Sequence, residues 1–310
     1  MNEMNLGEQI TAVPFDEWEI VTHCDLCGGA DFKSTDDRLR VARCKRCGHT
    51  FFERRPTQQA IARHYDQGDN YAMWLGQTEN RRRANLRRLD LIAPYLTRGP
   101  ILDVGCGMGE FLNLVAERWP RVGLYGTELS KTALTLAKEK FGLQHLFCGQ
   151  LQDAQWPEGS FETITLWQVL EHVPSPSAVV RKANDLLQDG GRLLIAVPND
   201  SDARAFSRWV KHALQRCIGR TPPTRYDPLG AHGEVHLHHF SPRTLRYLLS
   251  QNRFRVIQGD LDLCRAPTFS HILFVHICRF ADKFLRCNLY ETMVVIAQKV
   301  GPHGRGSERT

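Results

Sequence analysis

The stretch Ile-Leu-Asp-Val-Gly-Cys-Gly-Met-Gly at residues 101–109 decides the fold of this chain. Its apolar half predicts a buried strand, and its second half predicts a tight glycine-rich turn. Because glycine lacks a Cβ, the backbone of such a turn can lie close to a ligand. A helix expected at about 109–118 points its unpaired N–H groups and the positive end of its dipole at the same place. The stretch therefore predicts a site for a nucleotide-like cofactor.

A second strand is expected soon after this turn, where an apolar run over 122–126 leads into Thr127 and Glu128. A carboxylate at the end of the second strand can accept two hydrogen bonds from the hydroxyls of a ribose. The plainer alternative is an exposed glutamate that contacts no ligand. The glycine turn upstream favours the ribose role for Glu128.

The chain between 100 and 200 alternates strand and helix patterns, which predicts a parallel sheet covered on both faces. Two more strands and a helix that starts with Ser-Pro follow near the C-terminus. The remaining expected elements are strands at about 144–147, 161–167, 192–197, 253–259 and 292–298, and helices at about 57–65, 80–93, 176–188 and 241–251.

These features together resemble the class I S-adenosylmethionine-dependent methyltransferases that act on small molecules. The Asp-x-Gly-x-Gly-x-Gly pattern is similar to their motif I, and Gln-Val-Leu-Glu-His-Val at 168–173 looks like a segment common in that family. The resemblance is strong over about 80–200 and moderate over 241–299. It implies an α/β fold, namely a Rossmann-like, doubly wound, mostly parallel seven-stranded sheet, and it implies S-adenosyl-L-methionine as the cofactor.

The resemblance also implies which residues bind the cofactor. The family usually has Gly-Asp after the third strand, whereas this chain has Gly149-Gln150. A glutamine carbonyl can still accept a hydrogen bond from an adenine amino group but lacks the charge, so somewhat weaker binding is expected. The expected cofactor residues are Asp103, Gly105, Cys106, Gly107, Gly109, Glu128, Leu129, Gln150, Leu151 and Gln168.

Four of the ten cysteines form two C-x2-C pairs, Cys24 with Cys27 and Cys44 with Cys47, separated by sixteen residues. Two such knuckles present four thiolates in a tetrahedron, which suits a structural Zn²⁺ ion. Gly28 and Gly48 follow the two knuckles, where a tight turn favours a residue that tolerates positive φ. The neighbouring histidines, His23 and His49, are alternative ligands in a mixed set. The metal should fold this ribbon and leave no open position for chemistry.

The partner of this ribbon stays open at this point. Basic residues surround its second knuckle and indicate either a surface for nucleic acid or an ordinary solvated face. Some small-molecule methyltransferases that this chain resembles carry an N-terminal cysteine module on the substrate side, and certain ribosomal RNA methyltransferases carry a zinc ribbon. The basic residues are Arg43, Lys45, Arg46, Arg54 and Arg55.

Composition and length limit the class of protein to which this chain can belong. Apolar residues make up 42% and charged residues 24% of the 310, which is ordinary for a globular protein, and the net charge of +6 permits anionic partners without demanding them. We expect a cytoplasmic protein with reduced cysteines, because neither a signal peptide nor a membrane-spanning segment is seen.

We divide the chain into an arm and ribbon (1–55), linker helices (56–99), a methyltransferase domain (100–300) and a tail (301–310). A helical insertion at about 201–230 interrupts the domain. The basic amphipathic stretch 203–218 can be a lid, a membrane-surface contact or a helix packed on the core, and a second apolar stretch lies at 269–285. The arginines in the helix expected at 80–93 are interpreted as a solvated face.

Histidines supply the candidate catalytic groups. His172 follows the fourth strand at the carboxyl edge of the sheet, where it is a candidate base for a hydroxyl acceptor or a structural residue of the turn. If the segment from 232 to 239 is extended, Glu234, His236 and His238 share one face. That face suits a substrate contact, a base or a metal ion, while a plain loop is the alternative.

The sequence thus predicts an S-adenosylmethionine-dependent methyltransferase with an N-terminal zinc ribbon. Its expected acceptor is a small polar molecule, a sugar or a lipid-linked precursor, methylated on oxygen or carbon, with peripheral contact to the inner membrane surface as an option. The first alternative is an RNA methyltransferase whose ribbon reads RNA, and the second is a non-catalytic module that only binds the cofactor.

Overall fold

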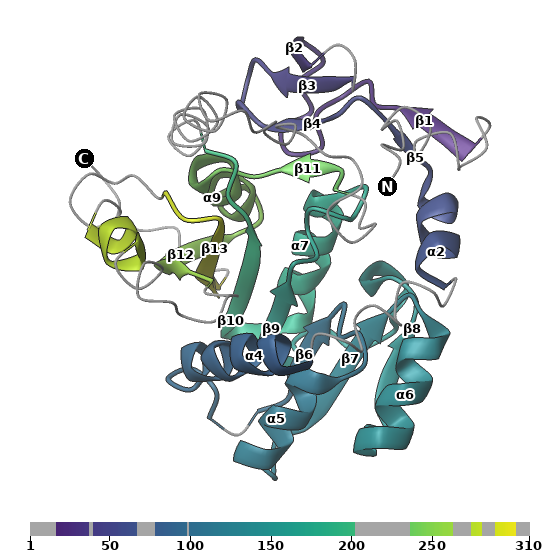
Figure 1. Ribbon diagram of the computed structural model, residues 1–310, viewed down its shortest axis with the longest axis vertical. Helices are drawn as coiled ribbons and strands as arrows, with labels where there is room; N and C mark the ends of the chain where they lie inside the picture. Colours follow the sequence, from purple (N-terminus) through teal and green to yellow (C-terminus); the bar gives the residue numbers. More distant parts are fainter. Residues whose placement is uncertain are drawn as a thin grey trace, which may run out of the picture.

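The computed structural model describes residues 17–36, 40–66, 78–97, 99–201, 236–262, 274–280 and 289–301. Its centre is a seven-stranded sheet with the strand order β12-β13-β10-β9-β6-β7-β8 (Figure 1). The strands are β6 (Ile101–Val104), β7 (Leu124–Glu128), β8 (His145–Cys148), β9 (Phe161–Trp167), β10 (Leu187–Pro198), β12 (Phe254–Leu261) and β13 (Thr292–Lys299).

Along the sheet, β8, β7, β6, β9 and β10 pair in parallel, whereas β13 runs antiparallel to both of its neighbours. This arrangement confirms the predicted Rossmann-like, mostly parallel seven-stranded sheet. The central strands are buried on both faces, which explains why they read as nearly continuous apolar runs rather than as alternating patterns.

Helices cover both faces of the sheet, and each face has its own core. One core joins Leu194 and Ala196 of β10 with α4, α5 and α6, and the other joins Leu193 and Ile195 with α7 and α9. Serine side chains cap α6, α7 and α9 by accepting hydrogen bonds from backbone N–H groups of the first turn. The helices are α4 (Thr78–Ile92), α5 (Glu110–Arg118), α6 (Lys131–Phe141), α7 (Pro176–Leu186) and α9 (Pro242–Gln251), with a 3-10 turn η3 (Leu151–Asp153).

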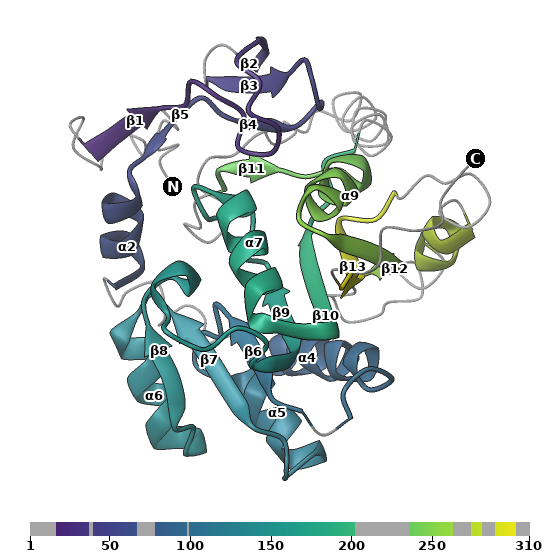
Figure 2. The same ribbon diagram turned by 180° about the vertical axis from the view of Figure 1, so that it is seen from behind.

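The cysteine-bearing segment forms a second sheet above α7 and α9 (Figures 1 and 2). It contains β2 (Phe32–Asp36), β3 (Val41–Cys44) and β4 (Thr50–Phe52), and its fourth strand is β11 (His238–His239), from the far end of the chain. A separate pair joins β1 (Trp18–Ile20) to β5 (Arg54–Pro56), and α2 (Gln58–Asp66) follows. The ribbon therefore shares a sheet with the C-terminal part, and the division at residue 55 stays a prediction.

Several predicted boundaries shift. The helix expected to reach residue 188 ends at Leu186, and β10 starts at Leu187 instead of 192. The pairing of β10 with β9 changes register between Leu187 and Arg192, where Gly190 has a φ of 77°. The glycine pair thus lies in an irregular stretch inside a longer strand rather than in a turn before a shorter one.

The insertion at 203–218 lies outside the described residues, and of the second apolar stretch only 274–280 is described, as a helix. Phe274, Ile277 and Phe280 of that helix are exposed. Within the described part of the chain, no helix has the length and apolar character needed to cross a membrane.

Candidate cofactor and acceptor site

A cavity of about 430 Å³ opens at the carboxyl edge of β6, β7 and β9. Its volume lies in the range of small-molecule sites, and its position is where ligands bind in open α/β sheets. Every residue predicted to contact the cofactor lines this cavity, except Gly109. His172 and His236 line it as well, together with α4 and with Gln58 and Ile61 of α2.

Gly105, Gly107 and Gly109 have positive φ values of 69°, 54° and 76°. Gly107 and Gly109 have different structural roles. A Cβ on Gly109 would lie 2.4 Å from Leu143 and 3.1 Å from Ala137 of α6, so this glycine allows α6 and the residues after it to pack closely. A Cβ on Gly107 would meet no atom within 4 Å. Gly107 therefore leaves open space inside the cavity, as a close-fitting ligand requires.

Glu128 is held against this turn by three backbone N–H groups. Gly107 donates to its Oε2 at 3.0 Å, and Leu129 and Ser130 donate to its Oε1 at 2.8 and 3.1 Å. A carboxylate offers about four acceptor sites, so capacity for a ribose hydroxyl remains. The arrangement fits the ribose role, which stays a prediction.

Asp103 lies at the inner wall of the cavity and is 3% exposed. Its Oδ1 accepts a hydrogen bond from Thr165 Oγ1 at 2.7 Å. Burial raises the pKa of this carboxyl to about 7, although the Thr165 hydrogen bond and the positive charge of Arg88 oppose the shift. A cationic ligand group beside it would favour the ionised form.

Residues of α4 close the side of the cavity, and Asp262, directly after β12, holds one of them; the sequence did not point to this contact. Arg88 binds the buried Asp262 through Nη2–Oδ2 at 2.8 Å and Nε–Oδ1 at 3.3 Å, and its guanidinium lies 5.0 Å over the Trp167 ring. Gln168, with a φ of 59°, donates to the same carboxylate at 3.3 Å. This network fixes Gln168, one of the predicted cofactor residues.

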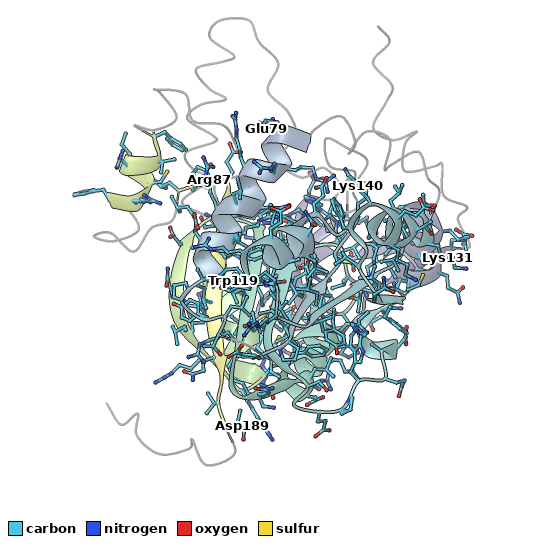
Figure 3. The ribbon with its side chains drawn as sticks, turned by 90° about the horizontal axis from the view of Figure 1, so that it is seen from below. Glu79, Arg87, Trp119, Lys131, Lys140 and Asp189 are labelled. Carbon is cyan, nitrogen blue, oxygen red and sulfur yellow. The ribbon has the colours of Figure 1, made fainter. Side chains whose placement is uncertain are left out.

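The predicted solvated arginine face of α4 is therefore only partly correct. Arg82 and Arg83 are exposed, whereas Arg81 pairs with Glu110 at 2.8 Å and lines the cavity together with Arg88 (Glu79 and Arg87 mark α4 in Figure 3). Positions 81 and 88 lie seven residues apart, which puts both on one face of a helix. This seven-residue spacing is the feature of the sequence that could have predicted their shared position.

Glu171, His172 and His236 come together where the loop after β9 meets the segment before β11, and the two histidines line the cavity. Their ligand atoms lie within 4.8 Å of one another, the two imidazole rings are 4.8 Å apart, and His172 Nε2 lies 3.7 Å from Glu171 Oε1. Two imidazoles beside a carboxylate can accept a proton or ligate a divalent cation. The structure thus places two of the three predicted histidines in one site.

His238 does not join them. It is 3% exposed, its Nδ1 lies 3.0 Å from His49 Nε2 in the ribbon, and it is absent from the cavity wall. Strand pairing covers only residues 238 and 239, so the expected alternation does not extend back to His236, and Glu234 lies outside the described residues. Burial lowers the pKa of His238 well below its usual range.

The four knuckle cysteines converge in the ribbon with all their Sγ atoms within 4.8 Å of one another. Cys24 and Cys47 are 3.6 Å apart and Cys27 and Cys44 are 3.5 Å apart, close to the roughly 3.8 Å edge of a Zn–thiolate tetrahedron. The hydrogen bond between Cys24 and Cys47 raises the pKa of the first thiol and lowers that of the second to about 5. This donor set fits Zn²⁺.

The two neighbouring histidines do not complete this set. His49 turns its Nε2 to His238, and the exposed His23 contacts Thr22. Gly28 and Gly48 have φ values of 68° and 80° and donate to the carbonyls of Cys24 and Cys44. These are the tight turns that the knuckle pattern predicts.

Comparison with known proteins agrees with this geometry. A family model described as a methyltransferase domain matches residues 78–258. The chain belongs to this family of methyltransferase domains. Fold and family together confirm the predicted class I S-adenosylmethionine-dependent methyltransferase, with S-adenosylmethionine as its cofactor.

Curated relatives include the ubiquinone biosynthesis O-methyltransferases of Xanthomonas euvesicatoria and Nitrosococcus oceani. The first is 38% identical over 141 residues, 43% of this chain and 53% of the relative, and the second is 29% identical over 181 residues, 49% of this chain and 72% of the relative. The chain thus spans about half the length of the Xanthomonas relative.

Among solved structures, similar folds occur in the complex between the Haloferax volcanii Trm112 methyltransferase activator and a methyltransferase, and in magnesium protoporphyrin IX methyltransferase from Synechocystis. The first has a TM-score of 0.54 at 14% identity and covers 77% of this chain and 98% of its own. The second has a TM-score of 0.51 at 14% identity and covers 78% and 99%. These similarities concern the fold alone.

Proposed function

We propose that this protein transfers a methyl group from S-adenosylmethionine to a hydroxyl oxygen of a small acceptor. The observation that carries the proposal is one cavity lined by two chemically different groups. The glycine turn with Glu128, called here the cofactor end, and the imidazoles of His172 and His236, called the acceptor end, both line it. The O-methyltransferase names of the curated relatives support transfer to oxygen and make ring hydroxyls and lipid-linked hydroxyls the first acceptors to test.

The cofactor, when bound, supplies a methyl group already activated on a sulfonium. The protein therefore has to align the acceptor and manage one proton. Gly107 leaves room for the cofactor, Glu128 is proposed to accept the ribose hydroxyls, and Asp103 is proposed to face its positive charge. His172 or His236 would accept the acceptor's proton, and Glu171 would stabilise the imidazolium that forms.

The ribbon is proposed to hold one structural Zn²⁺ on Cys24, Cys27, Cys44 and Cys47. The contacts of its basic side chains support a small-molecule acceptor better than an RNA-binding role of the ribbon. Lys45 pairs with Asp31 at 2.9 Å, Arg46 donates to the Cys27 carbonyl at 3.1 Å, and Arg55 pairs with Glu19 at 2.6 Å. These side chains therefore already serve contacts within the ribbon.

The test supplies purified protein with S-adenosylmethionine labelled in the methyl group and with lipid, small polar and RNA fractions of source cells. We expect label in the lipid or small polar fraction, strongly reduced in a His172→Ala, His236→Ala double variant. The matched control is His145→Ala, because His145 is an exposed histidine of β8 that stacks on Tyr125 away from the cavity. Label that appears only in RNA would contradict the proposal.

A further inference from the structure

The loop that carries Glu171 and His172, residues 168–175, is attached to the ribbon at several points. The first is β11, which pairs with β4 so that His238 lies opposite Phe51 and His239 opposite Thr50. On the other side, Leu237 and His238 donate their N–H groups to the Glu171 carbonyl at 2.7 and 3.1 Å. One short segment thus binds both the ribbon and the loop, and it begins directly after His236.

A buried histidine pair reinforces this connection. His49 and His238 are 0% and 3% exposed, their rings lie 5.2 Å apart, and a hydrogen bond of 3.0 Å joins them. Arg55, in β5 shortly after β4, donates its Nη1 to the Pro174 carbonyl at 2.8 Å. The ribbon therefore binds the loop at Glu171 through β11 and at Pro174 directly.

The third attachment comes from inside the first cysteine knuckle. Asp25 lies between Cys24 and Cys27, and its carboxylate accepts from Ser177 N at 2.8 Å, from Ser177 Oγ at 2.9 Å and from Ser175 Oγ at 2.6 Å. Ser175 is the N-cap of α7, where the loop ends. A negative charge at this helix start is also electrostatically favourable. The position of Asp25 depends on the knuckle, and the knuckle depends on its metal.

At the cofactor end the hydrogen bonds that hold the glycine turn come from the large sheet, and Gln168, the first residue of the loop, is held by Ala196 and Asp262 rather than through β11. The turn after β6 is held by Thr127, whose carbonyl accepts from Gly105 and Cys106 at 2.8 and 2.9 Å, and by Glu128. These partners belong to β7, within the same parallel sheet. Loss of the ribbon's fold would therefore act on one end of the cavity and spare the other.

We propose that the ribbon is a positioning element for the acceptor end of the cavity. When folded around its metal, it fixes the loop 168–175 and the start of the segment at His236, so that the rings of His172 and His236 stay 4.8 Å apart at the acceptor end. Asp25, His49 and Arg55 are positioning residues that act through the loop and β11. The term acceptor end rests on the proposed function, whereas the coupling between the ribbon and the loop does not.

Hydrogen–deuterium exchange of the full chain tests the coupling without turnover. A Cys24→Ser, Cys44→Ser variant, confirmed as metal-free by metal analysis, should exchange the amides of 171–178 and 237–240 about tenfold faster. Amides of β6 and β9 should keep their protection, and the affinity for S-adenosylhomocysteine should stay within about twofold. The matched control is Cys148→Ser, because Cys148 is exposed and lies outside the knuckles.

Unchanged exchange at 237–240 in the metal-free variant would overturn the proposal, and so would a loss of protection in β6 and β9 as well. A second pair of variants changes the ribbon but leaves its four cysteines intact. Asp25→Ala should speed exchange at 175–178 and lower kcat or raise the acceptor KM, while the cofactor affinity holds. Asp31→Ala, in the same ribbon but 74% exposed and paired only with Lys45 in the described contacts, should change neither.

The two proposals fail in different ways. If Asp25→Ala speeds exchange in the loop while turnover on an identified acceptor stays unchanged, the ribbon positions the loop but that end does not serve the acceptor. That result would contradict the proposed function. Slower turnover with unchanged exchange in the loop would instead contradict the positioning role of the ribbon.

Discussion

The two ends of the cavity are held in different ways. The cofactor end is built by neighbouring strands and the turns that follow them, within residues 101–151, together with Gln168 after β9. The acceptor end is built by a loop, a short strand and a cysteine ribbon that are far apart in the chain. We therefore expect cofactor binding and acceptor placement to be mechanically separate, so that each can be altered without the other.

The largest effect is expected at the acceptor end. His172→Ala should lower kcat by about 10²- to 10⁴-fold, because a positioned base contributes roughly that much to a proton transfer. The affinity for S-adenosylhomocysteine, measured by titration calorimetry, should remain within about twofold of the native value. A variant that loses cofactor affinity as strongly as kcat would show that the two ends are one unit.

The next effect belongs to the cofactor end. Gly107→Ile places a β-branched side chain at a φ of 54° and fills space inside the cavity, so cofactor affinity should fall by about 100-fold or more. Gly142→Ala is the matched control, because Gly142 has a φ of 66° with no atom near its Cβ, and it caps α6 outside the cavity. The control should lose some stability but keep its affinity, and equal losses of affinity would contradict the assignment.

A third prediction concerns Arg88 in the side wall of the cavity. Arg88→Ala leaves Asp262, which is 2% exposed, without its bidentate partner and should lower the free energy of unfolding by about 3 kcal/mol. Arg83→Ala removes an exposed pair with Glu79 and should cost about 0.5 kcal/mol or less. Urea unfolding of both variants gives the comparison, and similar losses would show that the buried pair carries no special weight.

The smallest effect is a pH dependence. The pKa of Asp103 is raised to about 7 by burial, and its ionised form should bind the cationic cofactor better. Cofactor affinity should therefore rise with pH by up to about tenfold per unit below pH 7 and level off above it. Asp103→Asn should bind more weakly at pH 7.5 and lose the rise between pH 5.5 and 7. A parallel pH profile in both proteins would exclude Asp103 as the cause.

The cofactor end could be predicted from the sequence because its signals are local. The glycine turn, Glu128 and Gln168 each follow a recognisable strand, and strand ends of a parallel sheet meet at one edge. The four cysteines were predictable for the same reason, since each knuckle is a short local pattern. The mostly parallel seven-stranded sheet was predictable because these motifs resemble those of a known family.

The rest depended on partners that no local pattern connects. Arg88 and Asp262 are 174 residues apart in the chain, Asp25 and Ser177 are 152 apart, and His49 and His238 are 189 apart. Such pairs form only once the tertiary fold brings their elements together. The error over His238 has this origin, because its periodicity suggested the cavity while its pairing with β4 placed it in the ribbon.

An equilibrium titration of S-adenosylhomocysteine into the native chain and a Glu128→Ala variant tests directly whether the glycine turn and Glu128 form the cofactor site. We predict one molecule bound per chain, with an affinity at least about tenfold weaker in the variant, because hydrogen bonds to a charged carboxylate contribute roughly 1.5–3 kcal/mol each. Equal affinities in a variant that keeps the native fold, or no binding by the native chain, would contradict this assignment.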